Sequence, residues 1–334
     1  MPSDEVEGSF IRWPFSCAPA PKLLYPHTVI VSSCDNGRYL WDMRTINLSL
    51  FCLLSVLVLP LSAASVDTIS LPSAAMDKTY KAVIVLPDSY AGSEADFPVL
   101  YLLHGGIGHF DDYITKLPDS TMLRRLSDEN NLIIVMPEGE VFSYYLDSPV
   151  VPESQFETYI TEEVIGAIDE RYRTVARREG RVVTGLSMGG FGALYLSARH
   201  PDLFCAAGSM SGALNTDLEG WKLPEQGMRD VGRGFASILG PKDGNADVYR
   251  EANVLTYADA MKTNDVALTF DCGVDDFLIE PNRKLHQLLL ENGTPHDYAE
   301  RPGGYSWPYW GNSLPYHVLF FRKVLAEKGT LVEG

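Results

Sequence analysis

The stretch of this chain that most restricts its fold is residues 181–194, RVVTGLSMGGFGAL. A strand-like run at 181–184 leads into Gly185-Leu186-Ser187-Met188-Gly189, and a small-residue helical pattern at 190–200 follows. A G-x-S-x-G sequence between a strand and a helix predicts a tight turn that holds the serine in strained backbone. Glycines are needed on both sides, because a Cβ atom there would crowd the neighbouring strand and helix. Ser187 is therefore a candidate nucleophile.

From residue 78 onward, short apolar runs alternate with helical patterns. We expect strands at 78–86, 98–103, 132–136, 182–186, 204–210, 266–272 and 298–301, and helices at 154–172, 189–200 and 316–328. Continuous apolar strands separated by helices indicate a mostly parallel sheet covered on both faces. Residues 65–334 contain no repeat and no low-complexity linker, so they are predicted to form a single α/β domain.

Residues 215–264 interrupt this alternation. They are polar, contain several glycines and prolines, and show only short helical stretches. Because they follow the carboxyl end of the strand at 204–210, they are predicted to form a small cap-like insertion on the substrate side of the sheet.

Residues 43–64 have the pattern of a secretory signal peptide. Arg44 precedes a mostly apolar run, and Ser62-Ala63-Ala64 offers a cleavage site after Ala64. The apolar run of about 16 residues is shorter than the ~20 of a membrane-spanning helix. We therefore expect export to the periplasm or the extracellular space, without stable membrane insertion. Residues 1–42 are interpreted as an extension upstream of a true start at Met43, or as a disordered segment.

Charge, cysteine positions and motif spacing argue against a nucleic-acid partner, a disulfide and a metal or other cofactor. The formal net charge of −17 disfavours binding to nucleic acid, because the protein would repel the phosphates. Cys205 and Cys272 follow the signal pattern and fall on strands that would hold them roughly 20 Å apart, so two buried free thiols are expected. No H-x-x-x-H, C-x-x-C or G-x-G-x-x-G spacing occurs, and neither a metal ion nor another cofactor is expected.

Acyl transfer by a serine also requires a base, a carboxylate that orients the base, and hydrogen-bond donors for the oxyanion. The backbone N–H of Met188 would lie at a helix N-terminus and is one candidate donor. The loop after the strand at 98–103 reads His104-Gly105-Gly106. We expect the second donor to be the Gly106 N–H, with Gly105 as the alternative.

Three carboxylates follow or end the strand at 266–272. Asp276 lies past the turn and is the expected triad acid, with Asp275 as the second choice, whereas Asp271 is expected within the strand. The alternative is that all three are solvated turn residues.

Motifs along most of the chain agree with this succession of oxyanion loop, nucleophile and triad acid. They are YLLHGG, YITEEVIGAIDERYRT, REGRVVTGLSMGGFGALYLSARHPDLFCAAGSMSGAL, CGVDDFLIEPNRKLH and HDYAERPGGYSWPYW. Over residues 75–334 the sequence resembles the esterase family of α/β-hydrolases, which includes tributyrin-type, feruloyl and acetyl-xylan esterases and S-formylglutathione hydrolases. The resemblance implies the α/β-hydrolase fold, Ser187 as nucleophile, Asp276 as triad acid, and a histidine base after the last strand.

The expected base is missing from the place where the family has it. The family pattern is P-G-G-H-x-W, but residues 302–307 read P-G-G-Y-S-W, so Tyr305 occupies the histidine position. A phenol with a pKa near ~10 keeps its proton at pH 7 and cannot readily accept another. The chain is then a slow or inactive member, or carries a single-base change, or uses another histidine.

Three histidines are candidate substitutes for the missing base. His109 follows the oxyanion loop, His296 precedes the last strand, and His317 is expected to pack within the terminal helix. His200 and His286 are expected on helix surfaces.

The sequence thus predicts a secreted serine carboxylesterase for short-chain acyl or carbohydrate-linked esters, with activity that Tyr305 would impair. The alternatives are an inactive protein that binds a carbohydrate or ester ligand, and acyl transfer to a sugar. His104, Trp221 and Trp307 are candidates to line the substrate site, although core and cap packing is the favoured interpretation of the tryptophans.

Overall fold

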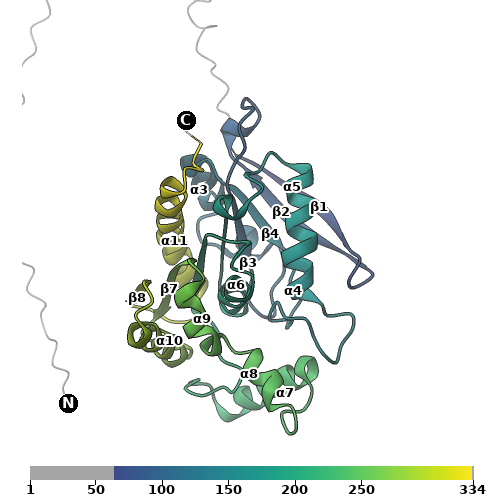
Figure 1. The fold of residues 1–334 in the computed structure, drawn as a ribbon, viewed down its shortest axis with the longest axis vertical. Helices are drawn as coiled ribbons and strands as arrows, with labels where there is room; N and C mark the ends of the chain where they lie inside the picture. Colours follow the sequence, from purple (N-terminus) through teal and green to yellow (C-terminus); the bar gives the residue numbers. More distant parts are fainter. Residues whose placement is uncertain (1–63, 333–334) are drawn as a thin grey trace, which may run out of the picture. The chain divides into compact units, whose positions relative to one another are not determined.

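The computed structural model describes residues 64–332, and most of this segment folds around one eight-stranded sheet (Figure 1). The strand order is β1-β2-β4-β3-β5-β6-β7-β8. Strands β3 to β8 are parallel, whereas β2 runs antiparallel to both β1 and β4. The strands are β1 (Ser65–Ser73), β2 (Lys78–Leu86), β3 (Val99–Leu103), β4 (Ile133–Pro137), β5 (Arg181–Gly185), β6 (Ala206–Met210), β7 (Ala267–Gly273) and β8 (Asp297–Arg301).

The strand predictions are confirmed to within two residues at every end, and one strand was missed. The missed strand, β1, pairs with β2 from Ser65↔Leu86 to Ser73↔Lys78. Most of its side chains are exposed or half-buried, so it has no apolar run to detect. Residues 1–42 and the predicted signal peptide at 43–64, except for Ala64, lie outside the described residues.

Helices cover both faces of the sheet. They are α2 (Asp112–Lys116), α3 (Met122–Asn130), α4 (Phe156–Thr158), the π-helical η2 (Tyr159–Val164), α5 (Ile165–Arg171), α6 (Met188–Arg199), α7 (Glu225–Leu239), α8 (Ala246–Glu251), α9 (Ala258–Thr263), α10 (Ile279–Asn292) and α11 (Trp307–Glu327). Short 3₁₀ turns lie at η1 (Asp88–Tyr90), η3 (Arg178–Gly180) and η4 (Val254–Tyr257). None of the helices within residues 64–332 has the length and apolarity to cross a bilayer.

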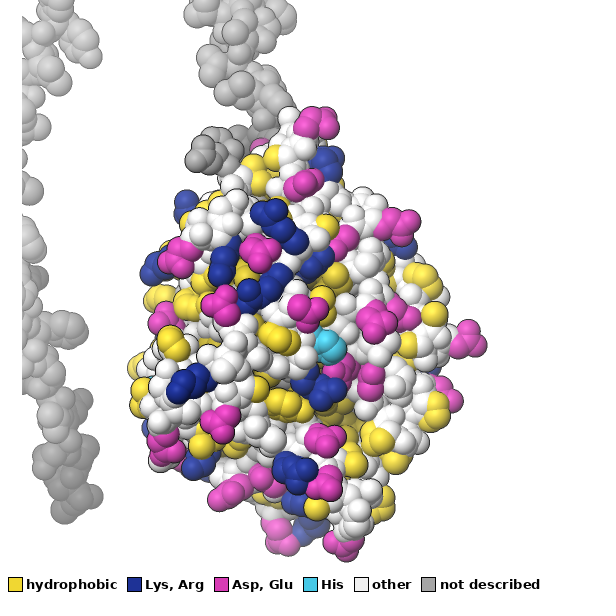
Figure 2. Space-filling model, viewed as in Figure 1, with side chains coloured by type: hydrophobic (Ala, Val, Ile, Leu, Met, Phe, Trp, Pro, Cys, Tyr) yellow, Lys and Arg dark blue, Asp and Glu magenta, His cyan; other side chains and the backbone are white. Residues whose placement is uncertain are grey.

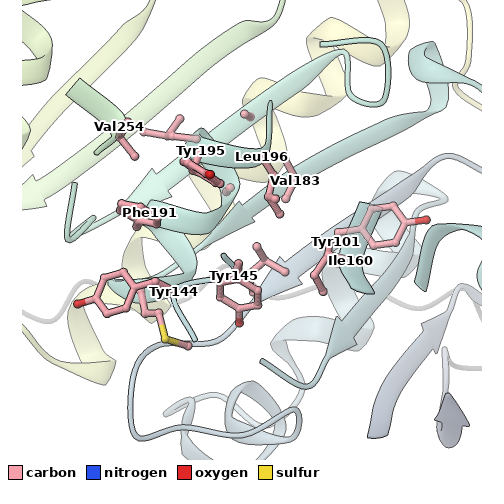
Figure 3. Packing of buried hydrophobic residues seen from close by; sticks show 14 of the residues in the cluster. Tyr101, Tyr144, Tyr145, Ile160, Val183, Phe191, Tyr195, Leu196 and Val254 are labelled. Carbon is pink, nitrogen blue, oxygen red and sulfur yellow. The ribbon is translucent and has the colours of Figure 1, made fainter. Parts of the chain in front are cut away.

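Two apolar cores lie on the two faces, as the alternation along β3 requires. Tyr101 belongs to the core that contains Phe191 of α6 and Ile160 of η2, part of which is drawn in Figure 3. Leu102 faces the opposite core, which contains Phe321 of α11. Cys205 and Cys272 are free and buried, as predicted.

The predicted helices exist, but one begins much earlier than expected. Residues 156–171 form α4, η2 and α5 in succession, and α6 closely matches the prediction. The terminal helix α11 begins at Trp307 instead of residue 316. Pro308 suits the first turn of a helix, because its missing N–H would have no intrahelical partner there. Pro315 lies inside α11, and because a proline usually ends a helix, the sequence did not predict one continuous helix here.

The insertion at 215–264 is more ordered than its sequence indicated. The expectation of only short helical stretches is wrong, because α7 contains 15 residues. Its buried Phe235 packs against Phe142 at 5.5 Å and Tyr144 at 4.5 Å between ring centroids, so the insertion rests on the loop that follows β4. Three glycines within α7 weakened its apolar pattern. In Figure 1, α7 and α8 lie together at the lower end of the molecule.

Candidate active site

Ser187 lies in the tight turn between β5 and α6, as the motif predicted. Its φ of 56° and ψ of −114° are strained values for a residue with a side chain. A Cβ at Gly185 would lie 2.5 Å from the Leu103 carbonyl oxygen, and a Cβ at Gly189 would collide with the same atom. The turn therefore depends on both glycines, and it leaves the Ser187 side chain at the C-terminal edge of the sheet.

Two backbone amides next to Ser187 are free to bind an oxyanion. The Gly106 and Met188 N–H groups have no hydrogen-bond partner among residues 64–332, whereas Ile107 N–H donates to the Val141 carbonyl (2.8 Å). A Cβ at Gly106 would lie 4.0 Å from the Met188 Cβ, so the two chain segments are adjacent. At Gly105 a Cβ would come within 2.5 Å of the Leu186 side chain, which explains the need for glycine there.

His104 supports this loop from below. Its side chain is only 1 % exposed. Nδ1 donates to the Gly105 carbonyl (2.8 Å), and the Gly139 backbone nitrogen lies 2.8 Å from Nε2. The expectation that His104 lines the substrate site is therefore wrong, because its ring is enclosed by backbone.

Glu138 completes this support. One of its oxygens lies 3.2 Å from His104 Nε2. Burial alone would raise the pKa of Glu138, but His104 and the N–H groups of Phe110 and Glu140 hold it below the usual value. The carboxylate therefore stays ionised at neutral pH and fixes the backbone around the oxyanion loop.

Asp276 occupies the position expected for the triad acid, beyond the end of β7. Its Oδ1 accepts a hydrogen bond from the Leu278 N–H (2.9 Å), whereas its buried Oδ2 has no partner within hydrogen-bond distance among residues 64–332. Burial raises the pKa of this carboxyl, an effect that the Leu278 N–H, the Ser211 hydroxyl and the Cys272 thiol only partly offset. An unpaired, buried carboxylate oxygen is the group that a triad histidine would engage.

The other two carboxylates differ in their surroundings. Asp271 lies within β7 and is buried, as predicted, whereas Asp275 is exposed. The alternative in which all three are solvated is wrong for Asp271 and Asp276.

Tyr305 contacts the candidate nucleophile directly. Its hydroxyl donates a hydrogen bond to Ser187 Oγ at 2.7 Å. The ring packs between Phe277, at 4.7 Å, and Trp310, at 4.8 Å, although 38 % of the residue remains exposed. Burial and the charge of Asp276 raise the pKa of Tyr305, while the bond to Ser187 lowers it. The phenol is therefore protonated at neutral pH and acts as a donor to Ser187.

No histidine within residues 64–332 forms a hydrogen bond with Ser187. His317 is buried, with Nε2 2.8 Å from Asp271 Oδ2 and Nδ1 2.9 Å from Thr184 Oγ1. The exposed His109 lies 3.5 Å from Glu138, and His296 is hydrogen-bonded to His286 (2.8 Å).

The two histidines expected on helix surfaces are only partly so. His286 and His200 are half-buried, and His200 lies 2.7 Å from the carboxylate of Glu157. Both are held by partners within the fold.

A buried network centred on Asp271 was not foreseen. Its carboxylate accepts hydrogen bonds from Tyr309, Ser313 and His317, and lies 3.2 Å from Arg301 Nη1. Burial alone would raise the pKa of Asp271, but these donors hold it below the usual value. The network joins β5, β7 and α11, and each of these elements lies next to a residue of the candidate site. Sequence spacing gave no sign of it, because its members come from distant parts of the chain.

The loop after β4 is a second feature that the sequence did not reveal. Tyr144 and Tyr145 both adopt left-handed backbone, with φ of 53° and 55°. The Tyr145 hydroxyl donates to the His104 carbonyl (3.1 Å), so this loop braces the oxyanion loop. Neither position is a glycine, so no sequence pattern predicted the positive φ of these two residues.

The two candidate tryptophans differ in their surroundings. Trp221 is only 8 % exposed, and its Nε1 donates to Asn215 Oδ1 at 2.5 Å. Its ring packs against Phe277 at 6.0 Å between ring centroids and does not line an open site, which agrees with the packing interpretation. Trp307 is half-buried against Tyr113 at 5.5 Å and Trp310 at 5.3 Å, so part of its ring is available to a ligand.

This mostly parallel sheet, with helices on both faces, has the α/β-hydrolase fold. A family model described as "Putative esterase" matches residues 73–321, and the chain belongs to this family.

The relatives agree with this assignment. The chain is 32 % identical over 240 residues to an esterase of Mycobacterium tuberculosis (strain CDC 1551 / Oshkosh), a match that covers 66 % of this chain and 51 % of that relative. It is 30 % identical over 234 residues to an acetyl esterase of Caldicellulosiruptor saccharolyticus, covering 67 % and 83 %. A solved ferulic acid esterase superposes with a TM-score of 0.65 at 27 % identity, covering 78 % and 98 %. The chain spans about half the length of the mycobacterial relative.

Proposed function

We propose that this protein is a carboxylic ester hydrolase that forms an acyl-enzyme on Ser187, and that Tyr305 makes its turnover slow. The observation that carries the proposal is the position of Ser187 in a strained turn, beside the two unpaired amides of Gly106 and Met188. An ester carbonyl oxygen placed on these amides would bring its carbon within reach of Ser187 Oγ.

Formation and hydrolysis of the acyl-enzyme each need two proton transfers. Ser187 Oγ attacks the carbonyl carbon and loses its proton, the alcohol leaves with a proton, and water releases the acid from the acyl-enzyme. A base is required in the first step, and the Tyr305 phenol, which already donates to Ser187 Oγ, cannot accept this proton at neutral pH. By comparison with subtilisin, a triad without histidine loses roughly 10⁶ in kcat and keeps roughly 10³–10⁴ over water.

Short-chain acyl and carbohydrate-linked esters are the proposed substrates. The acetyl esterase and the ferulic acid esterase among the relatives support this class. The exposed part of Trp307 offers a surface on which a sugar or an aromatic acid can stack. The signal-peptide pattern at 43–64 supports a location outside the cytoplasm, where such polymers occur.

The competing function is ligand binding without catalysis, and the Tyr305–Ser187 hydrogen bond is the observation that favours it. Labelling with a fluorophosphonate separates the two, because only an activated serine reacts. We expect slow but measurable labelling of the wild type and none of Ser187→Ala. Absence of wild-type labelling after prolonged exposure, with the binding of an ester ligand retained, would establish the binding protein instead.

A further inference from the structure

Ile107 is an unusual residue at the edge of the candidate site. It directly follows Gly106, its residue is 83 % exposed, and its φ is 60°. A β-branched side chain with positive φ is a genuine backbone outlier, for which Gly or Asn would be the unstrained choice. Neither core packing nor backbone preference accounts for an isoleucine here, and strain of this kind concentrates at ligand sites.

Val141 lies beside Ile107 and is also exposed. The Ile107 N–H donates to the Val141 carbonyl (2.8 Å), and a Cβ at Gly106 would lie 3.6 Å from the same carbonyl oxygen. Val141 is 49 % exposed. The backbone that carries these two apolar side chains is thereby fixed next to the amide that would hold the ester carbonyl.

The strand order determines which part of the ester these residues can meet. Ile107 follows β3 and Val141 follows β4, on one side of the nucleophile strand β5, whereas Asp276 and Tyr305 follow β7 and β8 on the other side. The departing alcohol must face the acid and base side, where it receives its proton. The acyl group therefore extends toward Ile107 and Val141.

We propose that Ile107 and Val141 form the acyl-chain wall of the site and select esters with an apolar acyl group. This proposal rests on the proposed function for the identity of the ligand. The backbone hydrogen bond between the two loops fixes the wall in place, and the exposed side chains gain contact only when an acyl chain lies against them.

Acyl-chain selection can be measured without turnover. Acetanilide, butyranilide and hexananilide are amide analogues of the esters, and their dissociation constants for the wild type can be obtained by ligand-observed NMR titration. Each fully buried methylene strengthens binding about 4-fold, so a one-sided wall should make hexananilide bind roughly 10-fold more tightly than acetanilide. In Ile107→Asn, which tolerates positive φ, we expect this ratio to fall to about 2-fold.

Two further variants keep the test decisive. Val141→Thr preserves shape and should also lower the ratio, which covers the case in which Ile107→Asn does not fold. Leu290→Asn, at an apolar side chain on α10 that is 62 % exposed, should leave the ratio unchanged. Equal ratios in the wild type, Ile107→Asn and Val141→Thr would overturn the proposal. A chain-length preference that these variants remove, in a protein without any hydrolytic activity, would overturn only the proposed catalysis.

Discussion

At the scale of single residues, the candidate site depends on glycines that let two chain segments approach. Gly189→Ala places a methyl group against the Leu103 backbone, and we expect a loss of about 2–3 kcal/mol in the free energy of unfolding. Urea denaturation measures this loss. Gly166→Ala is the matched control, because a Cβ there meets nothing within 4 Å and alanine is the better helix former, so a slight gain is expected. Equal stability of Gly189→Ala and the wild type would contradict the close approach.

The buried Asp276 carboxylate, whose Oδ2 has no hydrogen-bond partner among the described residues, should destabilise the folded protein at neutral pH. Because its folded-state pKa is raised, its contribution is most favourable below the unfolded value of about 3.9 and is lost as pH rises through the folded pKa. Asp276→Asn removes this cost, so we expect it to be about 1–2 kcal/mol more stable than the wild type at pH 7. The difference should shrink toward pH 4 in chemical denaturation. A variant less stable than the wild type at pH 7 would show that Oδ2 has a stabilising partner.

At the scale of elements, one buried network ties α11 to the sheet. Asp271→Asn weakens the bonds to His317, Ser313 and Tyr309, and should cost about 3 kcal/mol at pH 7. The folded-state pKa of Asp271 is lowered, so its stabilisation is present above the unfolded pKa and is lost as pH falls through the folded pKa. Denaturation at several pH values tests this dependence.

The neighbouring Asp275 provides the control for this experiment. It is exposed, so Asp275→Asn should change stability by less than about 0.5 kcal/mol at pH 7. If Asp271→Asn behaved like Asp275→Asn, the network would contribute no stability.

Elements with a continuous apolar run were predictable from sequence, and those without one were not. β3, which is buried along its whole length, has five consecutive apolar residues. β1 and α7 were missed because exposure in β1 and glycines in α7 removed the pattern. Those patterns depend on neighbours along the chain, whereas β1 is held by its pairing with β2 and α7 by the rings of Phe142 and Tyr144.

The features of the candidate site also divide into those that the sequence predicted and those that it did not. The positions of Ser187, Gly106 and Asp276 were predictable, because each follows a strand at a fixed point of the sheet, whereas their catalytic roles stay a prediction. Two other features were not predictable. The enclosure of His104 and the strained loop at Tyr144 and Tyr145 arise from contacts between segments that lie about 40 residues apart.

At the scale of the whole molecule, acidic and basic side chains are interspersed over the face drawn in Figure 2.

Cleavage after Ala64 would remove the apolar segment and leave a chain that starts where β1 starts, at Ser65. We expect N-terminal sequencing of the exported protein to begin at or near Ser65. A mature protein that retains Met1 would contradict the signal-peptide prediction.

We propose that the molecule retains an esterase site in which Tyr305 alone prevents fast turnover. The unpaired Asp276 Oδ2 and the Tyr305 hydroxyl at Ser187 Oγ mark the two contacts that an imidazole at position 305 would make. Tyr305→Phe is the control, because it removes the hydroxyl without supplying a base.

The most direct measurement is kcat for p-nitrophenyl acetate in the wild type and Tyr305→His. We expect an increase of about 10³-fold or more in Tyr305→His, which the further change Ser187→Ala abolishes. Equal and rapid hydrolysis by the wild type and Tyr305→His would contradict this account, because another base would then be activating Ser187.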